Sequence, residues 1–229
     1  PDLVLDQLAH AAETPPTSVL GAGEGRVAGG MWKPAGRRGA AERVHGVAEL
    51  GVRMAQERLE LARVESGQLP LHPIEVDLRA LLEQELEIVR PRAAERDLEI
   101  HLQIPADLRP VRADVERLHQ VVANLLDNAV KYATPGDPVI LAVENGVQNV
   151  EISVSNGVGQ HPPDVERIFD RFYRGDPSRP SAGGVGLGLS ISRELVTALG
   201  GRLWAELEGQ RLRVRMTLPA QTQLLLGPV

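Results

Sequence analysis

Polar residues recur at helical spacing in the segment NLLDNAVKYA, residues 124–133. Asn124, Asn128 and Lys131 are separated by four and then three positions, which places them on one face of a helix. Amide oxygens suit Mg²⁺, which keeps several waters and bridges phosphates, and a lysine adds a positive charge for phosphate. A plain polar helix face would carry the same residues. The opposite face of this segment is apolar, however, so these groups border a core and are candidate ligands.

A glycine-rich segment, GGVGLGL at 183–189, stands directly before a predicted helix. Glycines let backbone N–H groups approach phosphate oxygens, and the N-terminus of a helix attracts anions. A flexible loop without a ligand fits the same residues. The segment therefore indicates phosphate binding only in combination with a second motif, such as the polar helix face above.

A lone histidine, His10, stands in LAHAAETPPTSVLG, residues 8–21. A histidine is more often structural or solvated than catalytic, and its neighbours alone assign His10 no chemistry.

The elements around these residues divide the chain into two domains. A helix is expected over residues 1–20, interrupted by Pro15 and Pro16, since proline removes a helical hydrogen bond. Residues 21–38 contain six glycines and are expected to form a loop or a weak helix. Residues 39–66 carry an apolar seam at steps of four and three, typical of a helical bundle: Ala48, Val52, Ala55, Leu59 and Ala62. We expect a helical hairpin over 1–66 that pairs with a second copy as a four-helix dimer.

The second domain is expected over residues 77–219, after a linker at 67–76. Asp77 can cap a helix to about residue 96, and LEIHLQI (98–104) alternates as a strand does. Asp114 can cap a helix whose buried face is predicted to hold Leu118, Val121, Val122, Leu125, Leu126, Ala129 and Val130.

The rest of this domain is expected to add strands and one helix. A hairpin of two strands, PVILAVEN and NVEISVSN, comes first. A helix ending at Gly200-Gly201 and two final strands follow, and residues 220–229 form a tail. The expected fold class is α+β: the helical hairpin, then an α/β sandwich whose antiparallel-rich sheet is covered on one face by helices.

Composition excludes several classes of function. The net charge of −6 argues against a nucleic-acid partner, whose phosphates attract basic surfaces. No cysteine is present, which excludes disulfides and thiolate metal sites. No run of 18 apolar residues occurs, so any membrane-spanning segment is expected upstream of this sequence.

Four segments, in order, resemble the catalytic core of two-component sensor histidine kinases, of the superfamily that includes gyrase, Hsp90 and mismatch-repair ATPases. RLELARVESGQL resembles the end of the dimerisation hairpin, and HQVVANLLDNAVKYA resembles the asparagine box. IFDRFYRGDPSRP resembles the phenylalanine box and the start of the ATP lid, and GGVGLGLSI resembles the second glycine box.

The resemblance implies ATP and Mg²⁺ as ligands of the second domain. Asn128 is expected to ligate Mg²⁺ with Asn124 beside it, Lys131 to contact the phosphates and Tyr132 to line the pocket. Residues 174–183 correspond to the mobile lid, and its hinge and phosphate cradle to Gly184, Gly186, Leu187 and Gly188. Hydrolysing relatives carry a water-activating glutamate where Asn124 stands, which fits phosphoryl transfer to a side chain.

The segment AHAAETPPTSVLG resembles the family's phosphoacceptor box, S-H-E-L-R-T-P-L-T-S-I-L-G. His10 corresponds to the acceptor histidine and Thr14 to the threonine four residues later. The acid that follows the histidine in the family is replaced by Ala11. A missing general base typically costs about 10²–10⁴ in rate, and Glu13 is the candidate substitute on the same helix face.

The first glycine box departs from the family's V-x-D-x-G-x-G, whose aspartate accepts the adenine amino group. Counting back from Phe169 places Ser155 at the aspartate, with Gly157 and Gly159 on the glycines. Counting forward along the strand places Asn156 there instead. Neither is a carboxylate, and Asn156 is the better candidate because its amide oxygen accepts a hydrogen bond.

The expected function is transfer of the ATP γ-phosphoryl group to His10 and then to an aspartate of a response regulator, with weakened autokinase activity. The expected location is cytoplasmic, as the inner part of a membrane sensor. A degenerate kinase that binds nucleotide or dimerises without efficient phosphotransfer is the alternative. A serine/threonine kinase of the anti-sigma type shares the second domain, but residues 1–66 speak against it.

Overall fold

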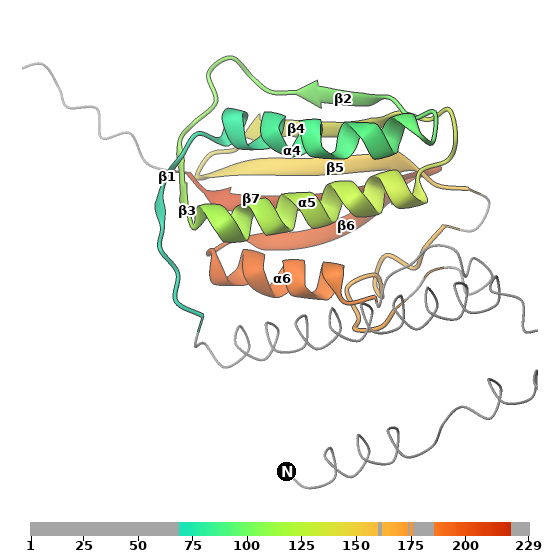
Figure 1. Ribbon diagram of the computed structural model, residues 1–229. Coiled ribbons are helices and arrows are strands. Elements are labelled where there is room, and N and C mark those ends of the chain that lie inside the picture. The colour runs from blue at the N-terminus through green and yellow to red at the C-terminus, as the bar shows by residue number, and fades with distance from the viewer. Residues whose placement is uncertain (1–68, 160–161, 174, 176–185, 221–229) are drawn as a thin grey trace, which may run out of the picture. The chain divides into compact units, whose positions relative to one another are not determined.

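The computed structural model describes residues 69–159, 162–173, 175 and 186–220, which form a helix-covered sheet (Figure 1). The predicted hairpin over 1–66, with His10, Glu13 and Thr14, lies outside the described residues, as do Gly184 and most of the predicted lid. Among the residues that are described, no helix combines the length and apolar character needed to cross a bilayer.

The main sheet has five strands in the order β2-β4-β5-β7-β6. Their bounds are Ile100–Gln103 for β2, Val139–Asn145 for β4, Asn149–Gly157 for β5, Arg211–Pro219 for β7 and Arg202–Glu208 for β6. β2 pairs with β4 in parallel, and the other three pairs are antiparallel. The predicted hairpin of β4 and β5 and the final pair β6 and β7 are confirmed.

Three helices cover one face of this sheet: α4 (Leu78–Ala94), α5 (Val115–Tyr132) and α6 (Gly188–Ala198) (Figure 1). The Asp77 side chain accepts from the Ala80 N–H at 3.0 Å and caps α4. α6 ends before Gly200, which has a φ of +81°, the left-handed geometry that glycine adopts easily. The predicted two-layer α/β sandwich is confirmed.

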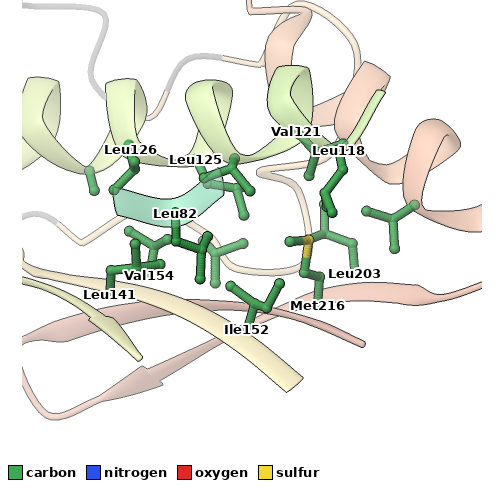
Figure 2. Packing of buried hydrophobic residues seen from close by; sticks show 14 of the residues in the cluster. Leu82, Leu118, Val121, Leu125, Leu126, Leu141, Ile152, Val154, Leu203 and Met216 are labelled. Carbon is green, nitrogen blue, oxygen red and sulfur yellow. The ribbon is translucent and has the colours of Figure 1, made fainter. Parts of the chain in front are cut away.

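The helix α5 lies at the centre of the core. Its buried residues are the seven predicted from the sequence: Leu118, Val121, Val122, Leu125, Leu126, Ala129 and Val130. Figure 2 shows the labelled α5 side chains pointing toward the sheet, where they face Leu141, Ile152, Val154 and Met216. Because one face of α5 is fixed in this core, the position of its polar face is fixed too.

A polar pair also joins α4 to α5. The Glu85 side chain is buried at 6% exposure, and its carboxylate lies 2.7 Å from Nδ1 of His119. A buried carboxylate needs such a partner, because its desolvation is otherwise uncompensated. This contact holds the two helices in register above the sheet.

Two short strands were not predicted. β1 (Ile74–Val76) pairs antiparallel with β3 (Val111–Ala113). β1 lies inside the segment 67–76 predicted as a linker, so the ordered sheet structure begins three residues earlier than the predicted start at residue 77. Three residues are too few to reveal strand alternation in a sequence, and pairing with a distant segment decides their conformation.

The outer face of the sheet carries a group of ion pairs. Arg215 of β7 lies 2.7 Å from the Glu151 carboxylate of β5 and 3.3 Å from the Glu206 carboxylate of β6. A third carboxylate, that of Glu208, lies 3.8 Å away. In the described sheet, β2 and β6 are the edge strands. β2 has four residues, and β6 carries Glu206 and Glu208 near its end.

Asp114 connects the N-terminus of α5 to the chain that precedes β1. Its carboxylate accepts from the Arg117 N–H at 3.1 Å and from the His72 N–H at 2.9 Å. Burial raises the pKa of Asp114, but these two backbone hydrogen bonds and the positive charges of Arg117 and His72 outweigh it, so the pKa lies below its ordinary value. Ionised Asp114 therefore stabilises the folded domain.

We expect Asp114→Ala to lower the free energy of unfolding by about 2 kcal/mol, because a cap is lost together with the hydrogen bond from the part-buried His72 N–H. Asp77→Ala removes a cap that holds one N–H and should cost about 1 kcal/mol. The folded pKa of Asp114 is lowered, so its contribution is present above the unfolded value of about 3.9 and is lost as the pH falls through the folded value. Urea unfolding at about pH 7 and pH 3 measures both effects. Equal losses in the two variants at neutral pH would contradict this assignment.

Candidate nucleotide-binding site

The polar face of α5 presents an amide oxygen at Asn128. The Asn128 Nδ2 donates to the backbone carbonyl of Asn124 at 2.9 Å, within the same helix. No described residue donates a hydrogen bond to the Asn128 Oδ1. The donor half of this amide is therefore occupied by the protein, and the acceptor half remains available for a cation.

Asn124 also donates through its side-chain NH₂ group, in this case to residues of α6. Its Nδ2 lies 3.3 Å from the Ser192 hydroxyl and 3.5 Å from the Gly188 carbonyl. Ser192 is fully buried, so this contact is made inside the α5–α6 interface. Ser192 was missed in the sequence, where it reads as a polar interruption of an apolar helix face.

Lys131 and Tyr132 close the polar face at the C-terminal end of α5. The Lys131 ammonium lies 4.8 Å from the centre of the Tyr132 ring, an arrangement that attracts a cation to the ring face. The Lys131 carbonyl accepts from Arg96 at 2.6 Å. These contacts hold a positive charge at the helix end, one turn beyond Asn128.

Asn156 lies at the end of β5 on the face covered by the helices. Val150, Ile152 and Val154 are buried at alternate positions of the strand, and Asn156 continues their phase while Ser155 does not. Asn156 is 3% exposed, and its Nδ2 donates to the Gly157 carbonyl at 3.0 Å. Of the two residues that sequence counting leaves open, the structure places Asn156 on the helix-covered face.

Gly157 is needed because another side chain lies against it. A Cβ at this position would lie 2.2 Å from a carboxylate oxygen of Asp137. The Gly157 carbonyl also accepts from the Thr134 N–H at 3.0 Å, which links β5 to the end of α5. Gly159 is exposed, and a Cβ there would meet nothing within 4 Å. The described structure thus accounts for Gly157 as a glycine but not for Gly159.

A backbone hydrogen bond joins two residues that flank the lid predicted over 174–183. The Phe172 N–H donates to the Gly186 carbonyl at 2.9 Å. Phe172 and Gly186 have φ values of +63° and +79°. Residues 172 and 186 are therefore fixed beside each other at the start of α6.

Leu187 and Gly188 follow directly. The Leu187 side chain is 1% exposed and belongs to the hydrophobic core, so only its backbone is available to a ligand. Leu187 is the N-cap of α6 and offers no side-chain hydrogen bond to the first turn. The N-terminal N–H groups of α6 are therefore not capped by that side chain, which suits an anion.

We expect Gly186→Ala to destabilise the domain by about 1–2 kcal/mol, since left-handed geometry is unfavourable for residues with a Cβ. The added Cβ would also lie 2.8 Å from the Tyr173 carbonyl. Gly188→Ala is the matched control. Its Cβ would lie 3.6 Å from the Asn124 Oδ1, an ordinary contact, and alanine favours a helix over glycine. Urea unfolding should rank Gly188→Ala at or above wild type and Gly186→Ala below it. A Gly188→Ala variant less stable than Gly186→Ala would contradict the role given to the left-handed geometry of Gly186.

The side-chain amides of three asparagines are therefore oriented alike, with the NH₂ group toward a protein acceptor. Asn124, Asn128 and Asn156 each use their NH₂ group within the protein, and none of the described residues donates to their side-chain oxygens. Asn124 meets the first turn of α6, whereas Asn156 lies at the end of β5 near Thr134. No group of three or more His, Cys, Asp or Glu side chains suited to a metal occurs in the residues searched, those that the structure describes. An Mg²⁺ ion here would rely on amide oxygen, water and phosphate.

Comparisons with known proteins identify the family of this chain. Residues 113–222 match the family described as histidine kinase-, DNA gyrase B- and HSP90-like ATPase. The chain is 38% identical over 168 residues to the probable sensor protein PcoS of Escherichia coli, covering 72% of this chain and 35% of PcoS. It is also 38% identical over 171 residues to the adaptive-response sensory kinase SasA of Synechococcus elongatus, covering 73% and 44%.

A solved structure has the same fold. The crystal structure of full-length ShkA in complex with AMPPNP matches with a TM-score of 0.70 and 29% identity, over 85% of this chain and 40% of that chain. The chain spans less than half the length of each of these three proteins.

Proposed function

Because this chain carries the ATP-binding catalytic domain of the two-component histidine kinase family, we propose that it transfers the γ-phosphoryl group of Mg·ATP to His10 and then to an aspartate of a response regulator. The main observation in support of the nucleotide site is the orientation of three side-chain amides, those of Asn124, Asn128 and Asn156, which all use their NH₂ groups in hydrogen bonds within the protein. Each presents an oxygen, and an Mg²⁺ ion and the adenine amino group both need an oxygen partner.

The residues present fit Mg·ATP. Asn128 would hold the cation through Oδ1, to which no described residue donates, and Asn124 lies one turn away on the same helix face. Lys131 and the N-terminus of α6, which the Leu187 side chain does not cap, would hold the phosphates. When bound, Mg²⁺ would neutralise phosphate charge and orient the γ-phosphoryl group.

The chain's own groups then carry the transfer. A ring nitrogen of His10 donates its lone pair to the γ-phosphorus as the bond from phosphorus to the bridging oxygen breaks, and ADP leaves. The ring loses the proton of its other nitrogen to a base. Asn124 stands where a hydrolysing enzyme needs a carboxylate, so water is not activated in competition with His10. Positioning and charge neutralisation do most of the work in such transfers.

Weakened autokinase activity follows from two substitutions. Ala11 provides no base beside His10, and Asn156 replaces a charged acceptor for the adenine amino group. A hydrogen bond to a charged group contributes roughly 1.5–3 kcal/mol and a neutral one roughly 0.5–1.5 kcal/mol, so nucleotide affinity is reduced as well.

The test is incubation of the full chain with γ-labelled Mg·ATP, with His10→Gln as the control. Acid-labile label on wild type and none on His10→Gln is expected, because phosphohistidine is acid-labile. Saturable ATP binding without labelling would favour a nucleotide-binding module that signals by conformation. Acid-stable label would favour a serine/threonine kinase on the same fold.

We also propose that residues 1–66 form a homodimer. The apolar seam from Ala48 to Ala62 needs a partner, and a second copy supplies an identical seam. Light scattering at micromolar concentration should give twice the 24.8 kDa chain mass. A monomer would rule out the four-helix dimer.

A further inference from the structure

Ser192 is a polar residue among core residues of α6. It is fully buried, and Ile191, Leu195 and Val196 of the same helix belong to the hydrophobic core. A hydroxyl in such surroundings is unfavourable unless it forms a hydrogen bond. The partner of the Ser192 hydroxyl is the Asn124 side chain of α5, whose Nδ2 lies 3.3 Å away.

The Asn124 NH₂ group is held at two points, both of them on α6. Besides the Ser192 hydroxyl, Nδ2 meets the Gly188 carbonyl at 3.5 Å. Residues 188 and 192 are four positions apart and share one helix face, and an NH₂ group has two hydrogens to donate. A carbonyl can only accept, so the branch of the amide that meets Gly188 is the NH₂ group. The shorter of the two contacts is the one that the Ser192 side chain supplies.

The Asn124 Oδ1 lies beside the first residue of α6. A Cβ at Gly188 would lie 3.6 Å from Oδ1, and glycine leaves this space open. The Ile191 N–H donates to the Leu187 carbonyl at 2.9 Å, which is the first bond of the helical ladder. The N–H groups of residues 188–190 therefore precede the ladder, at the end of the helix where the phosphates are proposed to bind.

We propose that Ser192 is a positioning residue for Asn124, an inference that rests on the nucleotide site proposed above. The Ser192 hydroxyl accepts from Nδ2 and keeps Oδ1 at the start of α6, where this oxygen accepts a hydrogen bond from a water of the Mg²⁺ shell. Mg²⁺ keeps several waters, and groups that bind its ligands from outside contribute to its affinity. Without the hydroxyl, the amide keeps only the 3.5 Å contact to Gly188 and is free to rotate.

Calorimetry of Mg·ATP binding to the full chain tests this role through a double-mutant cycle of Ser192→Ala and Asn124→Ala. Ser192→Ala should weaken Mg·ATP binding by about two- to tenfold, the range for one neutral hydrogen bond. Binding of ATP with a chelator present should change less, because the hydrogen bond acts through the cation. In the Asn124→Ala background, Ser192→Ala should have no further effect.

Two further variants separate this role from packing. Ser192→Cys stays close to the volume of serine but offers only a weak acceptor, so it should lose affinity as Ser192→Ala does. Ser190→Ala is the matched control, because Ser190 is also buried on α6 but its hydroxyl donates to the Leu187 carbonyl at 2.8 Å. Ser190→Ala should bind Mg·ATP as wild type does.

Wild-type affinity in Ser192→Ala or Ser192→Cys would overturn the inference alone. A loss of the same size in the Asn124→Ala background, or in Ser190→Ala, would overturn it as well, because the effect would then belong to packing of α6. Absence of saturable Mg·ATP binding by wild type would instead overturn the proposed nucleotide site, and this inference with it.

Discussion

The Ala11→Glu variant is expected to autophosphorylate on His10 up to about 10²-fold faster than wild type, the gain of a modest general base. Without a neighbouring carboxylate, the His10 imidazole has no fixed tautomer and nothing to take its proton. A glutamate at position 11 supplies both. Initial rates of acid-labile labelling from γ-labelled Mg·ATP measure the gain. Ala12→Glu is the matched control, because it adds the same charge one position farther away.

The reverse reaction should behave differently. In the family that this chain resembles, the residue four positions after the histidine orients water for dephosphorylation of the regulator, and Thr14 holds that position. Thr14→Ala should abolish phosphatase activity and leave forward labelling nearly unchanged. If wild type already labels His10 as fast as Ala11→Glu, another group serves as the base. Glu13 is then the first candidate, tested by Glu13→Gln.

Asn128→Ala is expected to weaken binding of Mg·ATP by about 10- to 100-fold, at least the loss seen when an outer partner of a metal ligand is removed. Binding of ATP without Mg²⁺ should change far less, because the lost atom is the Oδ1 proposed to hold the cation. Calorimetry with Mg²⁺ and with a chelator separates the two quantities.

The control for this variant is Asn145→Ala. Asn145 also carries hydrogen-bonded amide groups, since its Oδ1 accepts from the Arg109 N–H at 3.0 Å, but it lies on β4 outside the site. Its loss should leave both affinities unchanged. Equal losses with and without Mg²⁺ in Asn128→Ala would assign that amide to packing of α5 rather than to the cation.

Long amphipathic elements were predictable from the sequence. The seven buried residues of α5 follow from spacing alone, and its Asp114 cap follows from residue type. Spacing also placed Asn124 and Asn128 on the opposite face, because a helix that buries one side determines the other. By contrast, β1 and β3 have three residues each and depend on pairing between distant segments, which local pattern does not carry.

Candidate site residues could be predicted from the sequence where the spacing along one helix or strand places them together. Residues that join the site only through contacts between distant segments could not be predicted. Ser192 and Thr134 have no motif, and they matter only because the fold brings them to Asn124 and to Gly157. The choice between Ser155 and Asn156 also needed the fold. Counting gives both, whereas the phase of β5 places only Asn156 with the buried valines and isoleucine.

The edges of the sheet bear on how copies of this protein meet. An open edge strand can pair with another chain and begin aggregation, and natural edges resist this by being short or charged. Here β2 ends the described sheet with four residues, and β6 ends it with Glu206 and Glu208 near its terminus. β6 also carries Arg202 at its start, so charged side chains stand at both ends of this edge strand. A short edge and a charged edge both disfavour a continuous intermolecular sheet, so the dimer proposed for residues 1–66 would not need the sheets of two copies to join.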